Sequence, residues 1–174
     1  THLQKDLHLS AGMVAMPIAM ANLIAFLASG FWGYVADVLG RRWAMIIPAA
    51  IGALVTPFYL LSDSYPMVAG AFILQGAFLG AIYGQNPAYL SERFPTEVRA
   101  TASGFCYHQG AIWAGFTGPV LTYFAVSQPL GFTIPMLITT TGAAIVFVVT
   151  LFYSPETKGK ELVPQITLAE QPAE

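Results

Sequence analysis

The sequence predicts an all-α protein, a bundle of five helices that each cross a lipid bilayer. Hydrophobic residues make up 56% of the 174 residues and charged residues only 9%, whereas about a quarter of the residues in a soluble domain are charged. The charges are also segregated, which leaves uncharged runs at residues 7–36, 43–62, 64–91 and 100–155. A bilayer core of about 30 Å needs about 20 apolar residues in a helix, so each run is long enough to span it.

A turn signal divides the last run, which is too long for one helix. Residues 127–131 read S-Q-P-L-G, a combination typical of a turn. The runs are rich in Gly, Ala and Ser, which let membrane helices approach closely. The predicted spans are therefore about residues 11–36, 43–60, 65–89, 101–126 and 130–153, preceded by residues 1–10 and followed by a tail at residues 154–174.

The basic residues predict the orientation in the membrane. With five spans, the two ends of the chain lie on opposite sides. Lys5 alone falls on the side of the start; the other basic residues fall on the side of the tail, namely Arg41, Arg42, Arg93, Arg99, Lys158 and Lys160. The positive-inside rule then predicts a cytoplasmic tail and an extracellular start. Because no signal peptide precedes this outside start, we expect an upstream helix, and a longer N-terminal part, to be absent from the sequence.

Three motifs lie on the predicted cytoplasmic side. They read G-Y-V-A-D-V-L-G-R-R at residues 33–42, P-A-Y-L-S-E-R-F-P-T-E-V-R-A-T-A-S-G at residues 87–104, and S-P-E-T-K-G-K at residues 154–160. The first resembles the loop signature of the major facilitator superfamily. The other two are similar to segments of its sugar-porter and organic-acid branches. The resemblance covers about residues 7–162 and implies that the spans are helices eight to twelve of a twelve-helix permease, in its C-terminal half.

The resemblance also implies a cytoplasmic gate network. In this family the corresponding charges hold the inner gate shut while the cavity faces outward. Taken alone, the arginines would be explained as topology anchors, but the full pattern is more specific. A single surface ion pair contributes only about 0–1 kcal/mol, yet a network that breaks and re-forms can bias two conformations. The residues assigned to this network are Asp37, Arg41, Arg42, Glu92, Arg99 and Glu156.

Polar side chains at membrane depth are a second set of candidates, because burying them in a bilayer is costly. A rise of about 1.5 Å per residue places Asn22, Gln75 and His108 near the midplane, and Gln85 and Asn86 nearer to the cytoplasm. We expect these residues to line the substrate and proton pathway, with His108 able to titrate near neutral pH. The alternatives are a neutral His108 that bonds a neighbouring helix and a helix–helix hydrogen bond for Asn22.

Aromatic residues stand near the ends of the predicted spans. Trp and Tyr are enriched where a membrane protein meets the headgroups. We therefore interpret the following residues as an interfacial belt: Trp32, Trp43, Tyr65, Tyr89 and Tyr153.

The substrate is suggested only by resemblance. Residues 87–92, 99–101 and 104–110 look like the metabolite–proton symporter branch, which includes lactate and pyruvate permeases. This implies proton-coupled uptake of a small monocarboxylate by alternating access, with H⁺ as the coupling ion and no further cofactor. Sialic acid, aromatic acids and sugars are alternatives on the same scaffold. The implied partners are the substrate, the bilayer of the inner or plasma membrane, and the absent N-terminal half.

Other classes of protein fit the sequence less well. An enzyme is not expected, because neither H-E-x-x-H nor G-x-S-x-G occurs. A channel usually arranges rings of charge or carbonyl groups around a pore, and the spans carry no such charges. No basic cluster indicates nucleic acid. A non-transporting membrane scaffold would not need the three loop motifs.

Overall fold

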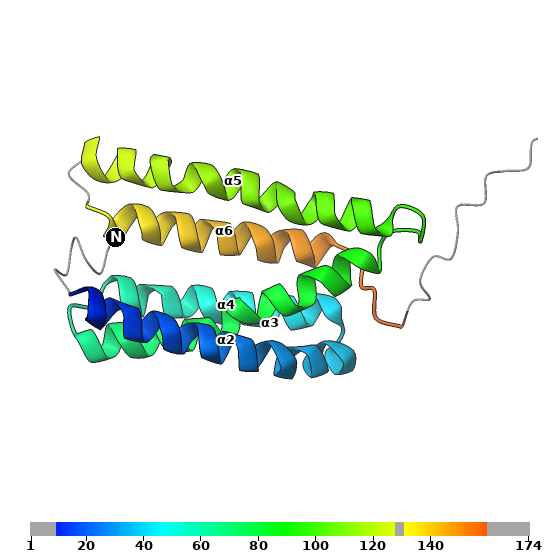
Figure 1. Ribbon diagram of the computed structural model, residues 1–174, viewed down its shortest axis with the longest axis horizontal. Coiled ribbons are helices and arrows are strands. Elements are labelled where there is room, and N and C mark those ends of the chain that lie inside the picture. Colours follow the sequence, from blue (N-terminus) through cyan, green and yellow to red (C-terminus); the bar gives the residue numbers. More distant parts are fainter. Residues whose placement is uncertain (1–9, 128–130, 160–174) are drawn as a thin grey trace, which may run out of the picture.

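The structure is a computed structural model that describes residues 10–127 and 131–159. Within these residues the chain forms five long α-helices and no strand (Figure 1). Consecutive helices run in opposite directions. They are α2 (Ala11–Leu39), α3 (Arg41–Leu60), α4 (Tyr65–Ser91), α5 (Arg99–Ser127) and α6 (Thr133–Tyr153). The predicted all-α bundle is thus confirmed.

The helix bounds lie within three residues of the predicted spans. The helices α2, α3, α4 and α5 run slightly further than predicted, into the links that carry the charges. This is expected, because Arg is a good helix former and a long charged side chain can reach water from a helix end. The predicted start of the last span at residue 130 lies outside the described residues, as do Lys5 and Lys160.

Four helices, α2, α3, α4 and α6, are long and apolar enough to cross a membrane, judged by length and composition. The helix α5 is equally long, at 29 residues, but it is not among the four. It is more polar, because it includes Ser103, His108 and Gln109 as well as several threonines. A fifth membrane span at α5 therefore stays a prediction.

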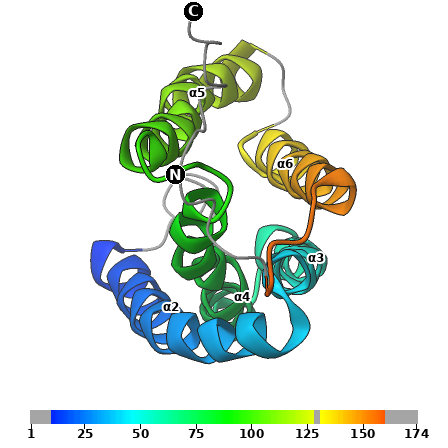
Figure 2. The same ribbon diagram turned by 90° about the vertical axis from the view of Figure 1, so that its right-hand side faces the viewer.

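A seam of small residues joins α4 to α2. Figure 2 shows α4 near the middle of the bundle, beside α2 and α3. The pairs that meet are Gly76 with Ala21, Gly80 with Ala25, and Gly84 with Ser29. A Cβ added at Gly76 would lie only 2.6 Å from the carbonyl oxygen of Ala21. Glycine at these positions allows the two backbones to approach closely, which is how helices gain contact where lipid removes the hydrophobic driving force.

The best-buried helix is α3, which lies between α4 and α6. One apolar cluster sits toward each of its ends. The cluster near the start of α3 contains Met45, Ile46, Tyr89 and Leu151, and the cluster near its end contains Tyr59, Leu60 and Val68. A buried Thr56, with 0% exposure, lies in the second half of the helix. These clusters fix α4 and α6 on opposite sides of α3.

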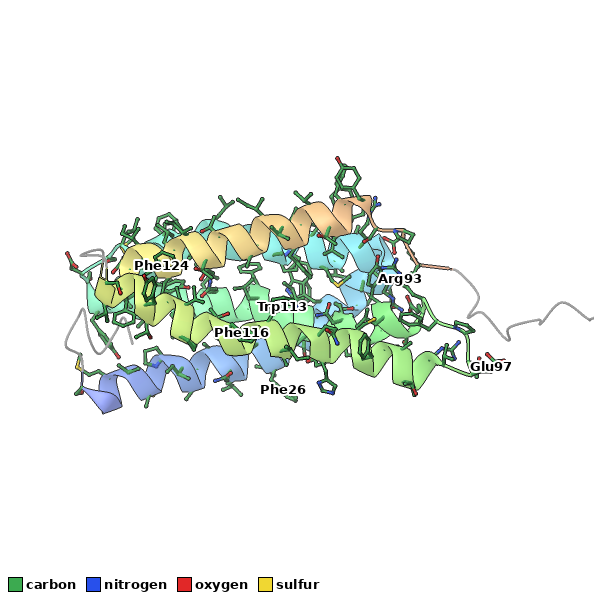
Figure 3. The ribbon with its side chains drawn as sticks, turned by 90° about the horizontal axis from the view of Figure 1, so that it is seen from above. Phe26, Arg93, Glu97, Trp113, Phe116 and Phe124 are labelled. Carbon is green, nitrogen blue, oxygen red and sulfur yellow. The ribbon has the colours of Figure 1, made fainter. Side chains whose placement is uncertain are left out.

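The helix α5 lies at the edge of the bundle, and none of its residues, all of which the structure describes, is buried. Large apolar side chains stand out from it, among them Trp113 (73% exposed) and Phe116 (61% exposed). Figure 3 shows both of these residues, together with Phe124 on the same helix and Phe26 on α2. Such continuous apolar surface marks a region that lipid or further protein covers.

Candidate functional site

All three predicted cytoplasmic motifs lie at one end of the bundle. We call this the charged end and define it as residues 37–42, 92–99 and 154–159. The α2–α3 link, the α4–α5 link and the segment after α6 meet there, on the right of Figure 1. Figure 3 places Arg93 and Glu97 at the same end. Residues up to 120 positions apart in the chain are therefore in contact.

Arg41 is the centre of the charged end. Its Nη1 lies 2.6 Å from Oδ1 of Asp37, one turn earlier in the chain, and its Nε lies 3.1 Å from Oε1 of Glu92, the C-cap residue of α4. The side chains of Arg41 and Glu92 are only 21% and 19% exposed, whereas that of Asp37 is 66% exposed. Since solvent screens an exposed pair much more strongly, the bond to Glu92 is the stronger link, and it joins α3 to α4.

Glu156 caps the amino end of α3. Its Oε1 accepts a hydrogen bond from the backbone N–H of Arg41 (2.9 Å), and its Oε2 accepts one from Arg42 (3.2 Å). The first N–H groups of a helix have no partner inside the helix and favour negative charge. A carboxylate from the segment after α6 thus supplies the cap that the α2–α3 link lacks.

Gly40 makes room for this cap. Its backbone has φ 104° and ψ 153°, a conformation almost restricted to glycine. An added Cβ would also lie 2.6 Å from Oε2 of Glu156. The glycine of the first motif is therefore needed both for the turn and for the close approach of the carboxylate.

The pKa of Glu156 lies below the ordinary carboxyl value. Partial burial, the largest single effect, raises the pKa. Four backbone N–H groups that donate to the carboxylate lower the pKa by more than burial raises it; they belong to Lys158, Arg42, Arg41 and Thr157. Glu156 is therefore ionised at neutral pH, and its negative charge faces the positive end of α3.

Residues 154–159, which follow α6 and are called the tail segment, make further hydrogen bonds at the charged end. Thr157 donates from Oγ1 to Oε2 of Glu92 at 2.5 Å. The hydroxyl of Tyr89 donates to the carbonyl of Pro155 at 2.8 Å, and Nζ of Lys158 donates to the carbonyl of Val38. The tail segment consequently connects the end of α2, the start of α3 and the end of α4.

Two of these contributions were not predicted. Thr157 carried no signal beyond its place in the third motif. Tyr89 was interpreted as a member of the interfacial belt, which is wrong: it is only 4% exposed, because its hydroxyl reaches the tail segment. The belt interpretation is wrong for Trp32 as well, which is buried and donates from Nε1 to the carbonyl of Ala77 on α4 at 3.2 Å.

The predicted network is therefore brought together in part. Asp37, Arg41, Glu92 and Glu156 form one connected set. The guanidinium of Arg42 instead donates to the carbonyls of Phe152 and Ser154. Nε of Arg99 donates to the carbonyls of Ser91 (3.0 Å) and Phe94 (3.2 Å), which closes the α4–α5 link.

The candidate residues at membrane depth have different hydrogen-bond partners. Gln75 is buried and donates from Nε2 to Oγ1 of Thr56 on α3 at 3.0 Å, and Thr56 donates onward to the carbonyl of Gly52. The face of α4 that carries Gln75 thus packs on α3. Asn22 donates from Nδ2 to the carbonyl of Ile18 in its own helix at 2.9 Å. A short amide side chain can reach a carbonyl one turn back.

The other three candidates lie at different places. Gln85 is buried, with 3% exposure, and its amide nitrogen faces Gly33 of α2. Asn86 is half-buried and lines a cavity of about 660 Å³ between α4, α5 and α6. His108 is exposed on α5, where its ring packs edge-on against Tyr107 at 5.8 Å between centroids. Asn22 and Gln75 line the same cavity of about 320 Å³ between α2 and α4, but the structure does not bring all five candidates together.

The described residues contain no group of three His, Cys, Asp or Glu side chains placed to hold a metal ion. The charged end is instead a set of hydrogen-bonded links between helices. It ties together three segments that are distant in sequence and carries two ion pairs and a helix cap. Such a set has the physical form of a latch, because few contacts hold several helix ends together.

A comparison with known families decides the assignment. The sequence profile of the Major Facilitator Superfamily matches residues 1–172. The chain belongs to the Major Facilitator Superfamily. The resemblance drawn from the three motifs is therefore confirmed at the level of the superfamily, and the charged end holds all three of them.

Curated relatives of this superfamily member carry transporter names. It is 30% identical over 57% of its length to the cis,cis-muconate transport protein of Acinetobacter baylyi, and 36% identical over 51% to the inner membrane metabolite transport protein YhjE of Escherichia coli. It is 28% identical over 87% of its length to the oxalate:formate antiporter of Oxalobacter formigenes. No solved structure matches the chain.

The chain spans 24%, 21% and 36% of the lengths of these three relatives. Membership of the Major Facilitator Superfamily and the apolar helices together make it a multi-pass membrane protein. Membership and the relatives' names point to transport rather than to catalysis.

Proposed function

We propose that the chain is part of a secondary active transporter that takes up a small carboxylate together with protons. The observation that carries the proposal is the connected set at the charged end, where Arg41 pairs with Glu92 and Glu156 caps α3. Its contacts join three helices and the tail segment. They can break and re-form as a unit, so they can bias two conformations by a few kcal/mol, which alternating access requires.

The orientation and the place in the membrane belong to this proposal. The charged end, as defined by its residues, contains five basic side chains: Arg41, Arg42, Arg93, Arg99 and Lys158. By the positive-inside rule this end faces the cytoplasm. A relative carries the words inner membrane in its name, which supports the same location here. The connected set would then close the cytoplasmic side.

The chain supplies one part of the transporter. Each half of such a permease contains two inverted three-helix units. Here α4 begins the second unit and packs against α2 and α3. The equivalent partner of α5 and α6 is a helix that precedes α2. Open space of about 660 Å³ adjoins α5 and α6 and supports this position for the preceding helix. The α2–α6 bundle would then be helices eight to twelve of twelve.

The substrate class rests on the relatives and on the polar groups. One relative is named for cis,cis-muconate and another for oxalate and formate, and all of these are carboxylates. No Arg or Lys occurs at residues 43–91 or 100–153, so the anion's partner would come from amides such as Asn86, from His108 or from the rest of the transporter. His108 is the side chain that we assign to proton coupling. A lactate or pyruvate carrier is the specific form proposed.

An exchanger of two carboxylates is the second candidate, because one relative is named an antiporter. The test is uptake of labelled lactate, oxalate and muconate by the full-length protein in proteoliposomes. Uptake of lactate driven by an inward proton gradient supports the proposal. Uptake driven only by internal carboxylate, at equal pH, supports the exchanger. Failure to accumulate any carboxylate under either condition would refute both.

A further inference from the structure

The two neighbouring arginines of the first motif have different surroundings. Arg41 pairs with two carboxylates. For Arg42, no carboxylate oxygen of the described residues lies within 4.0 Å of the guanidinium. Its Nη1 donates to the carbonyl oxygens of Phe152 (3.3 Å) and Ser154 (3.1 Å) at the end of α6. Of the donors of Arg42, the backbone N–H binds the carboxylate of Glu156, and the guanidinium does not. The positive charge of Arg42 is therefore not neutralised within the part of the chain that the structure describes.

Aromatic rings hold this charge in place. The guanidinium carbon lies 5.8 Å from the ring centre of Trp43 and 5.9 Å from that of Phe152. Both distances fall within the range of a cation–π interaction. Nε of Arg42 is enclosed and has no hydrogen-bond partner among the described residues. Nη2 donates to no atom of that part of the chain either, so the guanidinium is fixed in position with donor capacity unused.

The surroundings of Arg42 match the headgroup level of a bilayer. It stands in the first turn of α3, beside the last turn of α6, and both helices are long and apolar enough to cross a membrane. Trp43 is 41% exposed and Phe152 57% exposed next to it, as expected for aromatic residues at the interface. Below them, Ile145 and Val149 of α6 are 56% and 49% exposed. A cation therefore lies directly above an open apolar helix face.

We propose that Arg42, framed by Trp43 and Phe152, binds the phosphate of an anionic phospholipid from the surrounding bilayer. The phosphate would accept hydrogen bonds from the free side of the guanidinium, which is a favourable partner for phosphate oxygens. The acyl chains would lie along the exposed face of α6. The paired charge of Arg41 is already satisfied by Asp37 and Glu92, so Arg41 is not part of this lipid site.

The test uses the full-length protein in detergent, with native mass spectrometry of the folded fraction. The probes are phosphatidylglycerol, phosphatidylcholine and inorganic phosphate. The variants are Arg42→Gln, Arg42→Lys and the control Arg93→Gln. The control removes one positive charge from the same end, where the guanidinium of Arg93 lies over the ring of Tyr89 at 5.3 Å. Because native spectra report only folded protein, loss of stability in a variant does not obscure the result.

We expect the parent protein to retain phosphatidylglycerol in preference to phosphatidylcholine. Arg42→Gln should weaken the binding of phosphatidylglycerol about fivefold, which is the effect of one basic residue near an anionic surface. Arg42→Lys should keep part of this binding, and Arg93→Gln should keep nearly all of it. An equal loss in Arg42→Gln and Arg93→Gln would overturn the proposal in favour of general charge attraction. Competition by millimolar inorganic phosphate would overturn the assignment to a lipid.

Discussion

The carboxylate of Glu156 and the backbone of Gly40 are in direct contact across 116 positions of the chain: a Cβ at Gly40 would lie 2.6 Å from Oε2. This contact lets the tail segment cap α3. It also means that the glycine and the acid, which occur in two separate motifs, serve one structural purpose.

Replacing Gly40 with alanine should destabilise the protein. The backbone at φ 104° and ψ 153° is strained for alanine, at a cost of about 1–3 kcal/mol, and the new methyl group would displace Glu156. The free energy of unfolding in detergent measures the effect. Gly159→Ala is the matched control, because Gly159 also has a positive φ, 71°, but nothing lies within 4 Å of its Cβ position. Equal losses in the two variants would show that displacement of Glu156 contributes nothing.

The contribution of Glu156 to stability should depend on pH. Because its pKa is lower in the folded protein than the ordinary value of 4.5, the unfolded chain binds the proton more readily. The stabilisation is then complete above the ordinary pKa and is lost as the pH falls through the lowered folded pKa. The melting temperatures of the parent and of Glu156→Gln should differ at pH 7, and the difference should shrink as the pH falls below the ordinary carboxyl value of 4.5. A difference that does not shrink below that value would contradict this.

The α2–α4 seam should not tolerate a larger residue. A Cβ at Gly80 would overlap Ala25 of α2, so Gly80→Ala should lower the free energy of unfolding by about 1–3 kcal/mol. Gly70→Ala lies on the same helix with nothing within 4 Å of the added atom, and it should be close to neutral. The comparison is made by unfolding both variants in the same detergent. A neutral Gly80→Ala would show that the seam opens at little cost.

Cys106 should be shielded in the full-length protein. In this chain it is exposed and lines the cavity between α4, α5 and α6, where we place the preceding helix. Its rate of labelling by a maleimide, followed on the peptide that contains it, should be at least several-fold below that of Val146→Cys on α6. Val146 is 66% exposed on α6 and does not line that cavity. Similar labelling rates at both positions would contradict the proposal that the preceding helix covers this cavity.

The helices could be predicted from the sequence because lipid imposes a simple requirement. An uncharged run of 20 residues or more must hydrogen-bond its own backbone, so it must be helical. The bounds of α2 and α3 lie within three residues of the spans predicted from the uncharged runs, and both helices extend into the charged link between them. The prediction is weaker for α5, because its polar residues keep it out of the helices that are apolar enough to cross a membrane.

The site could be predicted only as far as the motifs reach. They indicated that Arg41 and Glu92 would meet, but not that Arg42 would turn away. Adjacent residues on a helix point about 100° apart, and spacing alone does not tell which of two arginines faces α4. Gln75 illustrates the same limit, because a polar residue at membrane depth fits a substrate path and a helix contact equally well. Its partner, Thr56, is revealed only by the packing of α4 on α3.

The role of the charged end as a gate is tested most directly by Glu92→Gln in the full-length protein. The variant removes the charge that pairs with Arg41 at 3.1 Å but keeps the shape of the side chain. Glu97→Gln, at an exposed position in the same link, is the control. Cysteine accessibility from the two sides of the membrane is the measurement. We expect Glu92→Gln to increase labelling of cavity positions from the cytoplasmic side and to decrease it from outside, with the control unchanged. Identical labelling of Glu92→Gln and the parent protein would contradict the account.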